Sequence, residues 1–338
     1  MRIVVDTMGS DNGCAEMTKG ALDAAKEYGL YLTLVGDKRI MSSVLEYYQE
    51  LKERVKLVNV PKFIKMGDDS SSVKSDNADC SMVEGMKLLS NGEGDAFVTA
   101  GSTGAAITSA TLYVKRIHGI RRAALAPVIP TAKGGTLLID CGANVECTPE
   151  YLLQFAYMGS FYASEVLKKQ KPEIGLLNVG TEDTKGDTLR KAAFSLLKSA
   201  SNEGRINFIG NVEARDILFG VCDVLVADGF SGNVLLKSME GVGAFFIKNL
   251  KESLTASLLT KLGALTVKKR LSVMRKMLNY KEIGGSPLVG VAAPVIKAHG
   301  SADAFTMKNA INQARMYTLG GIPTKIIQNI DYMKASST

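Results

Sequence analysis

The stretch MRIVVDTMGSD, residues 1–11, contains the pattern that decides the fold. A short β-branched run around Val4 is typical of a strand buried in a parallel sheet, and a polar loop that contains glycine follows it at once. The same unit recurs along the chain with stretches of helical period between its copies, which predicts an α/β protein with a largely parallel sheet and helices on its faces. The predicted strands are residues 3–6, 32–35, 57–60, 96–99, 125–129, 136–140, 174–178, 206–209 and 224–227.

The chain has 338 residues, of which 46% are hydrophobic and 22% are charged. These values are typical of a globular protein that buries a sizeable core, and they exclude disordered chains, fibres and small disulfide scaffolds. No internal repeat is visible, and the weak boundary near Pro149 does not indicate independent domains. We therefore expect residues 1–338 to form a single α/β unit.

The five cysteines contain no C-x-x-C pair, and an odd number without a preceding secretory signal predicts reduced thiols in the cytosol. Histidine occurs only at His118 and His299, which excludes a His-rich metal centre. No apolar run approaches the roughly 18 residues that a membrane span needs. The sequence thus predicts a soluble, cytoplasmic protein without a zinc site.

The net charge of +7 arises from one segment. Residues 251–281 contain eight basic residues and one acidic residue, and leucines recur there at helical spacing, which predicts a basic amphipathic helical insertion. Such a segment fits an anionic membrane surface or an acidic partner, or it is an ordinary helix pair on the core or at a dimer interface. Nucleic acid is a weaker interpretation, because no aromatic residue lies among these basic residues before Tyr280.

Five loops rich in Gly, Ser, Thr, Asn or Asp follow predicted strands. Open parallel sheets bind ligands at such loops, and the backbone N–H groups there suit phosphate or another oxyanion. One such loop alone is better explained as a tight turn, but five together indicate a ligand cleft. The loops are residues 6–11, 100–104, 140–144, 180–183 and 228–233.

The sequence lacks the common nucleotide and nucleophile motifs. No G-x-x-x-x-G-K-[ST] or G-x-G-x-x-G follows a strand, which weighs against ATP and NAD, and the absence of a G-x-S-x-G elbow disfavours a serine hydrolase. Lys185 places a cation beside the loop 180–183, although a solvated lysine is an equal interpretation. His299, next to Gly300 in a polar setting, is the better functional candidate of the two histidines.

Ordered blocks over nearly the whole chain resemble the bacterial acyl-ACP:phosphate acyltransferases, the PlsX family of phospholipid synthesis. Each block is weak alone, but their number and order make the resemblance specific. The chain departs from the usual Ala and Gly of the family at Thr7 and Ser10, and from its usual Asn at Ser102. The blocks are residues 6–11, 99–105, 138–144, 154–156, 158–159, 176–180, 185–186, 207–216, 228–234, 284–285, 295–296 and 299–300.

The resemblance implies a catalytic unit with a three-layer α/β/α sandwich, similar to phosphotransacetylases and isopropylmalate dehydrogenases, that works as a homodimer. It implies transfer of a long-chain fatty acyl group from acyl carrier protein to inorganic phosphate, without a metal or an organic cofactor. The acyl phosphate product would pass to a glycerol-phosphate acyltransferase in the membrane for phosphatidic acid synthesis. The enzyme would then be cytoplasmic and peripherally associated with the inner face of the cell membrane.

The resemblance also implies roles for individual residues. Lys185 would attract phosphate, and the Asn233 amide would donate to phosphate or to the oxyanion, while the turn 102–104 would supply backbone donors. The alternative is a phosphotransacetylase-like enzyme that uses acyl-CoA, and a basic interaction module on a degenerate scaffold is a rival from another class. The implied phosphate- and substrate-binding residues are Asp6, Gly9, Gly101, Ser102, Thr103, Gly104, Asn144, Gly229, Ser231, Gly232 and His299.

Overall fold

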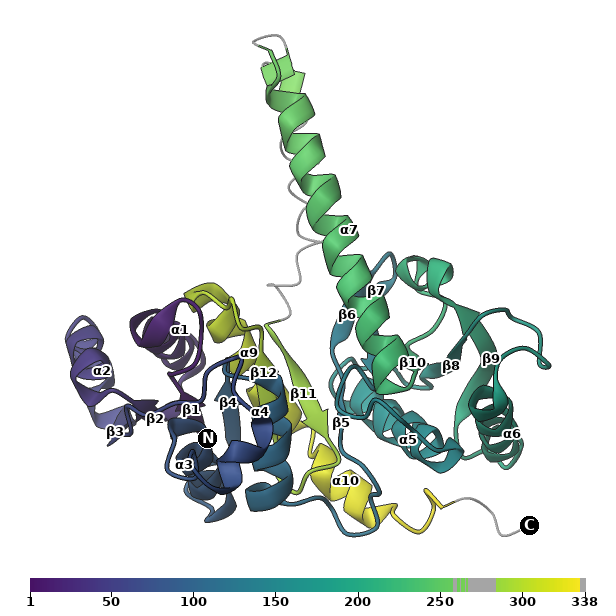
Figure 1. Ribbon diagram of the computed structural model, residues 1–338, viewed down its shortest axis with the longest axis horizontal. Helices are drawn as coiled ribbons and strands as arrows, with labels where there is room; N and C mark the ends of the chain where they lie inside the picture. The colour runs from purple at the N-terminus through teal and green to yellow at the C-terminus, as the bar shows by residue number, and fades with distance from the viewer. Residues whose placement is uncertain (258–259, 262, 265, 267–283, 335–338) are drawn as a thin grey trace.

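The computed structural model describes residues 1–257, 260–261, 263–264, 266 and 284–334, in which strands and helices alternate (Figure 1). The strands are β1 (Arg2–Asp6), β2 (Tyr31–Gly36), β3 (Val55–Asn59), β4 (Ala96–Thr99), β5 (Ala124–Leu125), β6 (Val128–Thr131), β7 (Gly134–Ile139), β8 (Glu173–Asn178), β9 (Asn207–Glu213), β10 (Val224–Val226), β11 (Gly285–Val289) and β12 (Val295–Ala298). The helices are α1 (Gly13–Tyr28), α2 (Lys38–Leu45), α3 (Ser81–Ser90), α4 (Thr103–Ser109), α5 (Pro149–Glu165), α6 (Thr188–Asn202), α7 (Gly229–Thr255), α9 (Ala304–Leu319) and α10 (Ile322–Gln328). Short helical turns cover Gln49–Arg54, Ser70–Lys74, Ala110–Val114 and Ala214–Phe219.

The strands form two sheets, so the predicted α/β class is confirmed but its strands do not share one sheet. The seven-stranded sheet has the order β3-β2-β1-β4-β12-β11-β5, and the five-stranded sheet has the order β6-β7-β10-β8-β9. Most pairs are parallel, whereas β11 pairs antiparallel with β12 and β5, and β6 pairs antiparallel with β7. The mostly parallel arrangement with helices on its faces therefore holds for each sheet.

The prediction of one strand over residues 125–129 is wrong, because the chain passes there from one sheet to the other. The Ala126 N–H donates to the Pro287 carbonyl of the seven-stranded sheet, while the Pro127 carbonyl accepts from the Leu138 N–H of the five-stranded sheet, both at 2.9 Å. Pro127 has no N–H of its own, so it interrupts the ladder at this crossing. Strands β11 and β12 were not among the predicted strands, and they extend the seven-stranded sheet.

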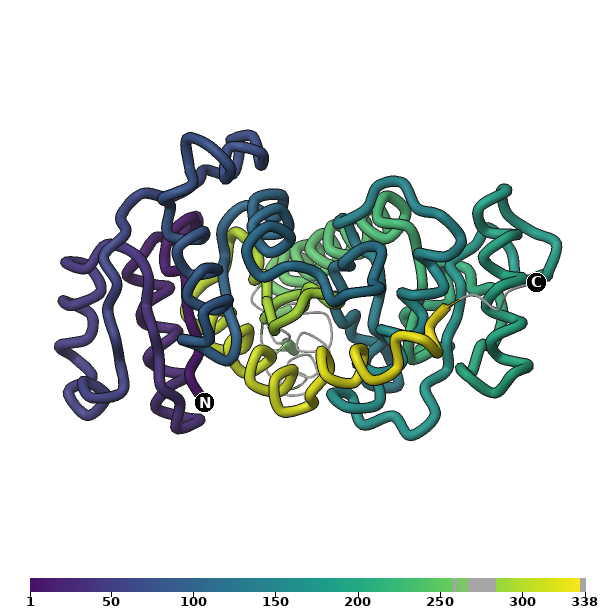
Figure 2. Tube along the Cα trace, turned by 90° about the horizontal axis from the view of Figure 1, so that it is seen from below, coloured from purple at the N-terminus to yellow at the C-terminus, as the bar shows by residue number. Residues whose placement is uncertain are grey.

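Helices cover both sheets and enclose the cores. Helices α1 and α9 pack against each other beside the seven-stranded sheet, and α5 and α6 pack against each other beside the five-stranded sheet. The carboxyl-terminal segment runs from α9 toward the five-stranded sheet, where α10 contacts α5 (Figure 2). This segment joins the two parts of the molecule on the side opposite to α7 (Figures 1 and 2).

Two sheet edges position the candidate site. We call the carboxyl ends of β1, β4 and β12, with the loops that follow them, the Lys297 edge. Parallel pairing places Asp6, Thr99 and Lys297 in one row of this edge. We call the carboxyl ends of β7, β8 and β10, with their following loops, the Asp140 edge, where β10 is the central strand.

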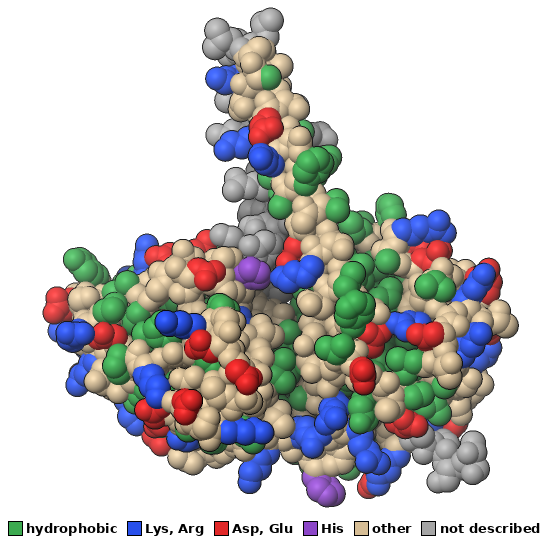
Figure 3. Space-filling model, in the orientation of Figure 1, with side chains coloured by type: hydrophobic (Ala, Val, Ile, Leu, Met, Phe, Trp, Pro, Cys, Tyr) green, Lys and Arg blue, Asp and Glu red, His purple; other side chains and the backbone are tan. Residues whose placement is uncertain are grey.

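Helix α7 starts at the Asp140 edge and projects away from both sheets (Figure 1). Apolar side chains gather along it in Figure 3, and Val242 and Phe245 are about 70% exposed. The predicted basic insertion at residues 251–281 overlaps the end of α7, but most of it lies outside the described residues. No helix in the described part of the chain has the length and apolar character of a membrane span.

Candidate functional site

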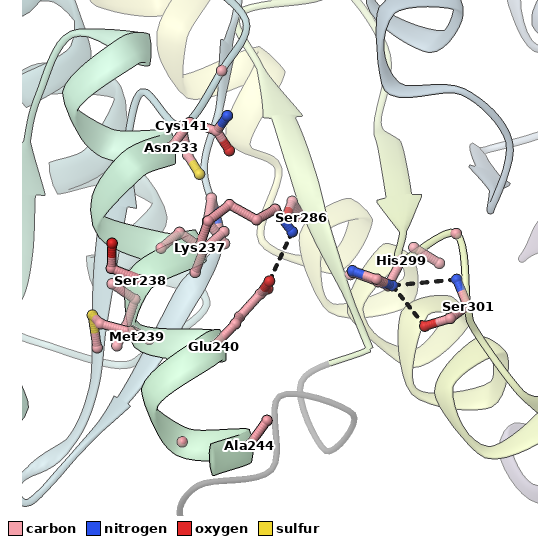
Figure 4. A pocket seen from close by; sticks show the side chains of 18 of the residues that line it. Cys141, Asn233, Lys237, Ser238, Met239, Glu240, Ala244, Ser286, His299 and Ser301 are labelled. Carbon is pink, nitrogen blue, oxygen red and sulfur yellow. Dashed lines mark hydrogen bonds and ion pairs between the residues drawn. The ribbon is translucent and has the colours of Figure 1, made fainter. Parts of the chain in front are cut away.

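A cavity of about 1380 Å³ lies between α7 and the Lys297 edge. Its first wall is formed by α7 residues from Asn233 to Lys251 together with apolar residues of segment 125–130. Its second wall contains residues 297–301, which end β12 and follow it. Figure 4 shows side chains of α7 on one side of this space and His299 with Ser301 on the other. The cavity thus joins an apolar surface to a polar end that belongs to the opposite sheet.

The first turn of α7 is fixed by an ion pair. The Asp228 carboxylate caps the helix by accepting a hydrogen bond from the Ser231 N–H at 2.9 Å, and it pairs with the Arg190 guanidinium. Arg190 also donates to the Ser231 hydroxyl at 2.8 Å and pairs with Asp187 at 2.6 Å. The Ser231 hydroxyl is therefore bound to a structural arginine, and Ser231 does not line the cavity.

Asp140 organises the loop beneath this helix turn. Its buried carboxylate accepts five hydrogen bonds at 2.6–3.2 Å. Two come from the backbone N–H and the side-chain amide of Asn144, and three come from other backbone N–H groups. Burial raises the pKa of Asp140, and the hydrogen bonds oppose that effect. The Asn144 amide also donates to the Ala123 carbonyl at 2.8 Å, so Asn144 holds the loop and does not line the cavity.

Glycines allow α7 to lie directly against this loop and bring Asn233 into the cavity. A Cβ on Gly232 would lie 2.0 Å from the Asp140 carbonyl oxygen, and one on Gly229 would lie 2.4 Å from the Asn144 carbonyl oxygen. Neither glycine lines the cavity. Asn233 does line it, next to Gly142, whose own Cβ would lie 3.7 Å from Asn233 Cγ.

At the Lys297 edge, the row across three strands combines an acid, a hydroxyl and a base. Thr99 Oγ1 donates to the Asp6 carboxylate at 2.8 Å, and the Met8 N–H donates to it at 3.0 Å. Burial raises the pKa of Asp6 from 3.8 to about 6. Asp6 is 1% exposed and does not line the cavity, so its carboxylate holds the loop after β1.

His299 lies at the polar end of the cavity. Its Nδ1 lies 2.8 Å from the Ser301 hydroxyl and accepts a hydrogen bond from the Ser301 N–H at 3.2 Å. A ring nitrogen that accepts from an N–H carries no proton, so the neutral ring carries its proton on Nε2. Burial and nearby lysines lower the pKa of His299, which also favours the neutral ring.

The two other loops at the Lys297 edge contact each other closely. Gly9 has φ +76°, and a Cβ there would lie 3.0 Å from Gly101 Cα. Gly9, Gly101 and Ser102 do not line the cavity, whereas Thr103 and Gly104 of α4 do. Of the sequence-predicted residues, the structure therefore brings Thr103, Gly104, Asn233 and His299 to one cavity.

Lys185 lies outside this cavity. It follows β8 at the Asp140 edge, with its Nζ 3.9 Å from Glu182 Oε1 and its side chain 51% exposed. Its backbone carbonyl accepts from the Asn178 amide at 3.1 Å, which fixes the loop but leaves the side chain in solvent. The role of Lys185 stays a prediction.

Sequence reasoning missed Lys297 and Lys237, which both line the cavity. Lys297 is 7% exposed, whereas the Lys237 side chain is 54% exposed and pairs with Glu240 at 2.7 Å. The neighbouring block 295–296 and His299 could have drawn attention to Lys297, but the lysine itself belongs to no motif.

The remaining chemistry of the cavity is limited. Cys141 lines it, but burial raises the pKa of this thiol to about 12, so it is a poor nucleophile at neutral pH. Within the described ranges, no group of three His, Cys, Asp or Glu side chains is placed to hold a metal ion. The described geometry therefore offers amide, imidazole and ammonium donors at the end of an apolar wall.

Solved structures share this fold. A phosphotransacetylase from Streptococcus pyogenes matches with a TM-score of 0.62 at 14% identity, covering 94% of each chain. A 4-hydroxythreonine-4-phosphate dehydrogenase from Klebsiella pneumoniae matches with a TM-score of 0.52 at 13% identity, covering 94% of this chain and 98% of that one. At such identities the likeness concerns the fold alone, and the predicted phosphotransacetylase-like fold is confirmed.

Sequence relatives are much closer. The family model described as "Fatty acid synthesis protein" matches residues 1–323. The phosphate acyltransferase of Thermoanaerobacter pseudethanolicus is 41% identical over 334 residues, 98% of each chain, and that of Oceanobacillus iheyensis is 46% identical over 316 residues, 93% of each. The chain therefore belongs to the phosphate acyltransferase family, the PlsX family, and is an acyltransferase.

Proposed function

We propose that this enzyme transfers a long-chain fatty acyl group from acyl carrier protein to inorganic phosphate and releases acyl phosphate for phosphatidic acid synthesis. The observation that carries the proposal is the cavity, in which an apolar wall of α7 and segment 125–130 meets cationic and amide side chains. A fatty acyl thioester needs the apolar wall, and phosphate needs the polar end. The names of the relatives support phosphate as the acceptor.

The reaction needs little covalent chemistry from the protein. Phosphate is partly dianionic near neutral pH, so one of its oxygens can attack the thioester carbonyl carbon without a strong general base. A C–O bond forms, the tetrahedral oxyanion collapses, and the C–S bond breaks to release a thiolate that takes a proton from solvent. The enzyme contributes mainly by holding the reactants together and stabilising the oxyanion.

Asn233 is the amide donor in this proposal. It projects from α7 into the cavity, where it lies next to the backbone of Gly142. Thr103 and Gly104 supply backbone from the other edge, and Lys185 attracts phosphate toward the Asp140 edge. Because Lys185 is exposed, its contribution would be long-range and sensitive to salt.

Acyl carrier protein as donor and membrane delivery of the product are finer parts of the proposal. Lys248 and Lys251 line the outer part of the cavity on α7 and would attract an acidic carrier protein. The exposed apolar side chains of α7 fit contact with a second copy or with the inner face of the membrane. We propose a homodimer that associates peripherally with that membrane.

The test is a direct assay for acyl phosphate. Long-chain acyl carrier protein or long-chain acyl-CoA is mixed with the enzyme and inorganic phosphate, and acyl phosphate is trapped with hydroxylamine. We expect product from the carrier-protein donor and little from acyl-CoA. Product from acyl-CoA alone would favour the phosphotransacetylase-like alternative, and no product from either donor would refute the proposed reaction.

Two variants test the residue assignments. Asn233→Ala should lower kcat by about 100-fold, as for removal of an oxyanion donor, whereas Asn249→Ala on the same helix should leave it unchanged. Lys185→Ala should raise the KM for phosphate most strongly at low salt. Lys198→Ala is its matched control, because Lys198 is an exposed lysine nearby that pairs with Asp183 at 2.6 Å. Equal rates for Lys185→Ala and wild type would refute the role of Lys185.

A further inference from the structure

Lys297 is a buried cation that opens onto the cavity. It is 7% exposed, and it lies in the row of Asp6 and Thr99 at the carboxyl ends of three parallel strands. Its Nζ donates to the Ala298 carbonyl and lies 3.5 Å from the Ala100 carbonyl. An ammonium has three N–H groups, so these two carbonyls leave one donor for the cavity.

No carboxylate in the described part of the chain forms an ion pair with Lys297. The acid of its own row, Asp6, is separated from it by Thr99, and its oxygens accept from Thr99 and Met8. Removing a lysine from water without a paired anion is costly, so such a group is normally kept for a ligand or a reaction. Asp11 also lines the cavity, but it forms no ion pair with Lys297 among the described residues, so the ammonium can still pair directly with a bound anion.

The surrounding charges leave Lys297 protonated at neutral pH. Burial, and to a smaller extent Lys237 of α7, lower its pKa to about 8, although Asp6 and Asp11 oppose this shift. His299 faces the same space as a neutral ring, and Glu240 pairs with Lys237 one turn away on the α7 wall of the cavity. Lys297 is therefore mostly charged below pH 8 and still near enough to neutrality for a bound anion to raise its pKa.

The other lysines of the cavity are less suited to this task. The Lys237 side chain is half-exposed and already paired with Glu240, while Lys248 and Lys251 lie farther along the projecting α7. Water and counter-ions screen an exposed lysine, whereas a buried ammonium meets its anion at low dielectric. Among the described lysines of the cavity, Lys297 is thus the one whose attraction for an anion is screened least.

We propose that Lys297 binds inorganic phosphate directly at the polar end of the cavity and holds it for attack on the thioester. This inference rests on the proposed function and adds a phosphate-binding residue on the Lys297 edge, opposite to Asn233. The acyl donor lies along the apolar wall, so phosphate at Lys297 meets the thioester where the two walls join. Lys185 then serves to attract phosphate and Lys297 serves to bind it.

The experiment measures acyl phosphate formation as a function of phosphate concentration. Lys297→Met keeps the length of the side chain but removes its charge, and we expect kcat/KM for phosphate to fall by roughly 10- to 100-fold, the range for a lost charged hydrogen bond. The KM for the acyl donor should change less than about twofold, because the apolar wall is intact. Lys297→Arg keeps the charge and should recover part of the loss.

Lys56→Met is the matched control, because Lys56 lies on β3 of the same sheet but is exposed and pairs with Glu93 at 3.0 Å. It should leave the phosphate dependence unchanged. A kcat/KM for phosphate in Lys297→Met within about twofold of wild type would overturn the inference, and so would a loss confined to kcat, which would place Lys297 at the oxyanion. Thermal unfolding of each variant establishes that it is folded.

The failure of the proposed function can be told from the failure of this inference. If wild-type enzyme forms no acyl phosphate from any donor, the proposed reaction fails. In that case phosphate binding is read from the rise in Tm with added inorganic phosphate, compared between wild type and Lys297→Met. A rise in wild type that Lys297→Met loses would support the phosphate site, and an equal rise in both, or none in wild type, would refute it.

Discussion

The two sheet edges carry similar residues but use them differently. At the Asp140 edge, Asp140 accepts five hydrogen bonds, four of them from its own loop. Asp228 caps α7 and forms an ion pair with Arg190. At the Lys297 edge, the Asp6 carboxylate accepts from the Thr99 hydroxyl and the Met8 N–H, and Lys297 lines the cavity. The first edge thus mainly supports α7, which brings Asn233 into the cavity, whereas the second edge contributes a buried cation to the cavity.

This contrast shows why polar loops after strands do not by themselves identify a site. A carboxylate that satisfies several backbone N–H groups stabilises a loop, and such a group has little capacity left for a ligand. A buried ammonium with one donor directed at a cavity has that capacity. Variants at the two edges test whether they differ in this way.

The largest effect is expected for Asp140→Ala. It leaves five donors without their acceptor, and because an unsatisfied buried donor costs about 1–3 kcal/mol, the free energy of unfolding should fall by at least about 4 kcal/mol. Asp6→Ala leaves two donors and should cost about half as much. Urea unfolding of both variants measures the difference, and equal losses would contradict the contrast between the edges.

The next largest effect is expected where a glycine lies directly against the backbone of another segment. Gly232→Ala should cost about 3 kcal/mol, since its Cβ would lie 2.0 Å from the Asp140 carbonyl oxygen and backbone atoms cannot rotate away. Gly101→Ala meets the flexible end of Met82 at 2.7 Å and should cost about 1 kcal/mol. Gly241→Ala, which meets nothing within 4 Å in the middle of α7, should stabilise by up to about 1 kcal/mol. If Gly232→Ala lowered the free energy of unfolding less than Gly101→Ala, the backbone of the Asp140 edge would be the one that adjusts more easily.

The sequence predicted most of the fold because buried parallel strands read as continuous β-branched runs. The predicted strands at residues 96–99 and 174–178 match β4 and β8 within a residue. Strand β11 begins with Gly285, Ser286 and Pro287, which individually disfavour strands, so only its pairing with β12 and β5 makes it one. Likewise, residues 125–129 read as one run, and no local signal says that its halves join different sheets.

The candidate site was predicted less completely. Asn233 and His299 were found because they adjoin glycine-containing loops, and both line the cavity. Lys297 was missed because a lysine within a strand normally faces solvent, and its burial depends on pairing with β4, which is distant in sequence. The position of Lys185 outside the cavity depends on the path of a loop, which residue types alone do not determine.

A pH dependence of about 2–3 kcal/mol is expected from Asp6. Its pKa of about 6 lies above the ordinary 3.8, so the folded state prefers the protonated carboxyl, and this contribution to stability is present below pH 4 and lost as the pH rises through 6. Asp6→Asn removes this titration, so the stability of the variant relative to wild type should increase between pH 4 and pH 7.

Asp37→Asn is the control for Asp6, with the opposite sign. Asp37 caps α2 by accepting from the Arg39 N–H at 2.9 Å, and the Arg39 side chain lowers the pKa of this carboxyl. Its contribution to stability is present above the ordinary pKa and is lost as the pH falls, so the variant should lose stability relative to wild type toward neutral pH. Urea unfolding at several pH values measures both slopes, and parallel slopes would show that Asp6 is not desolvated.

The smallest effect is expected for Ser10→Ala, at a position where the family usually has glycine. The Ser10 hydroxyl lies 3.1 Å from the Gly300 carbonyl and 3.3 Å from the Ala302 carbonyl, and it can donate to only one of them at a time. The Asn12 amide still donates to Ala302 at 2.9 Å, so the variant should lose less than about 1 kcal/mol of stability, and its KM for phosphate should change less than about threefold. A loss of several kcal/mol would mean that the Lys297 edge is held by a hydrogen-bond network as dense as that of Asp140, and the contrast between the two edges would then fail.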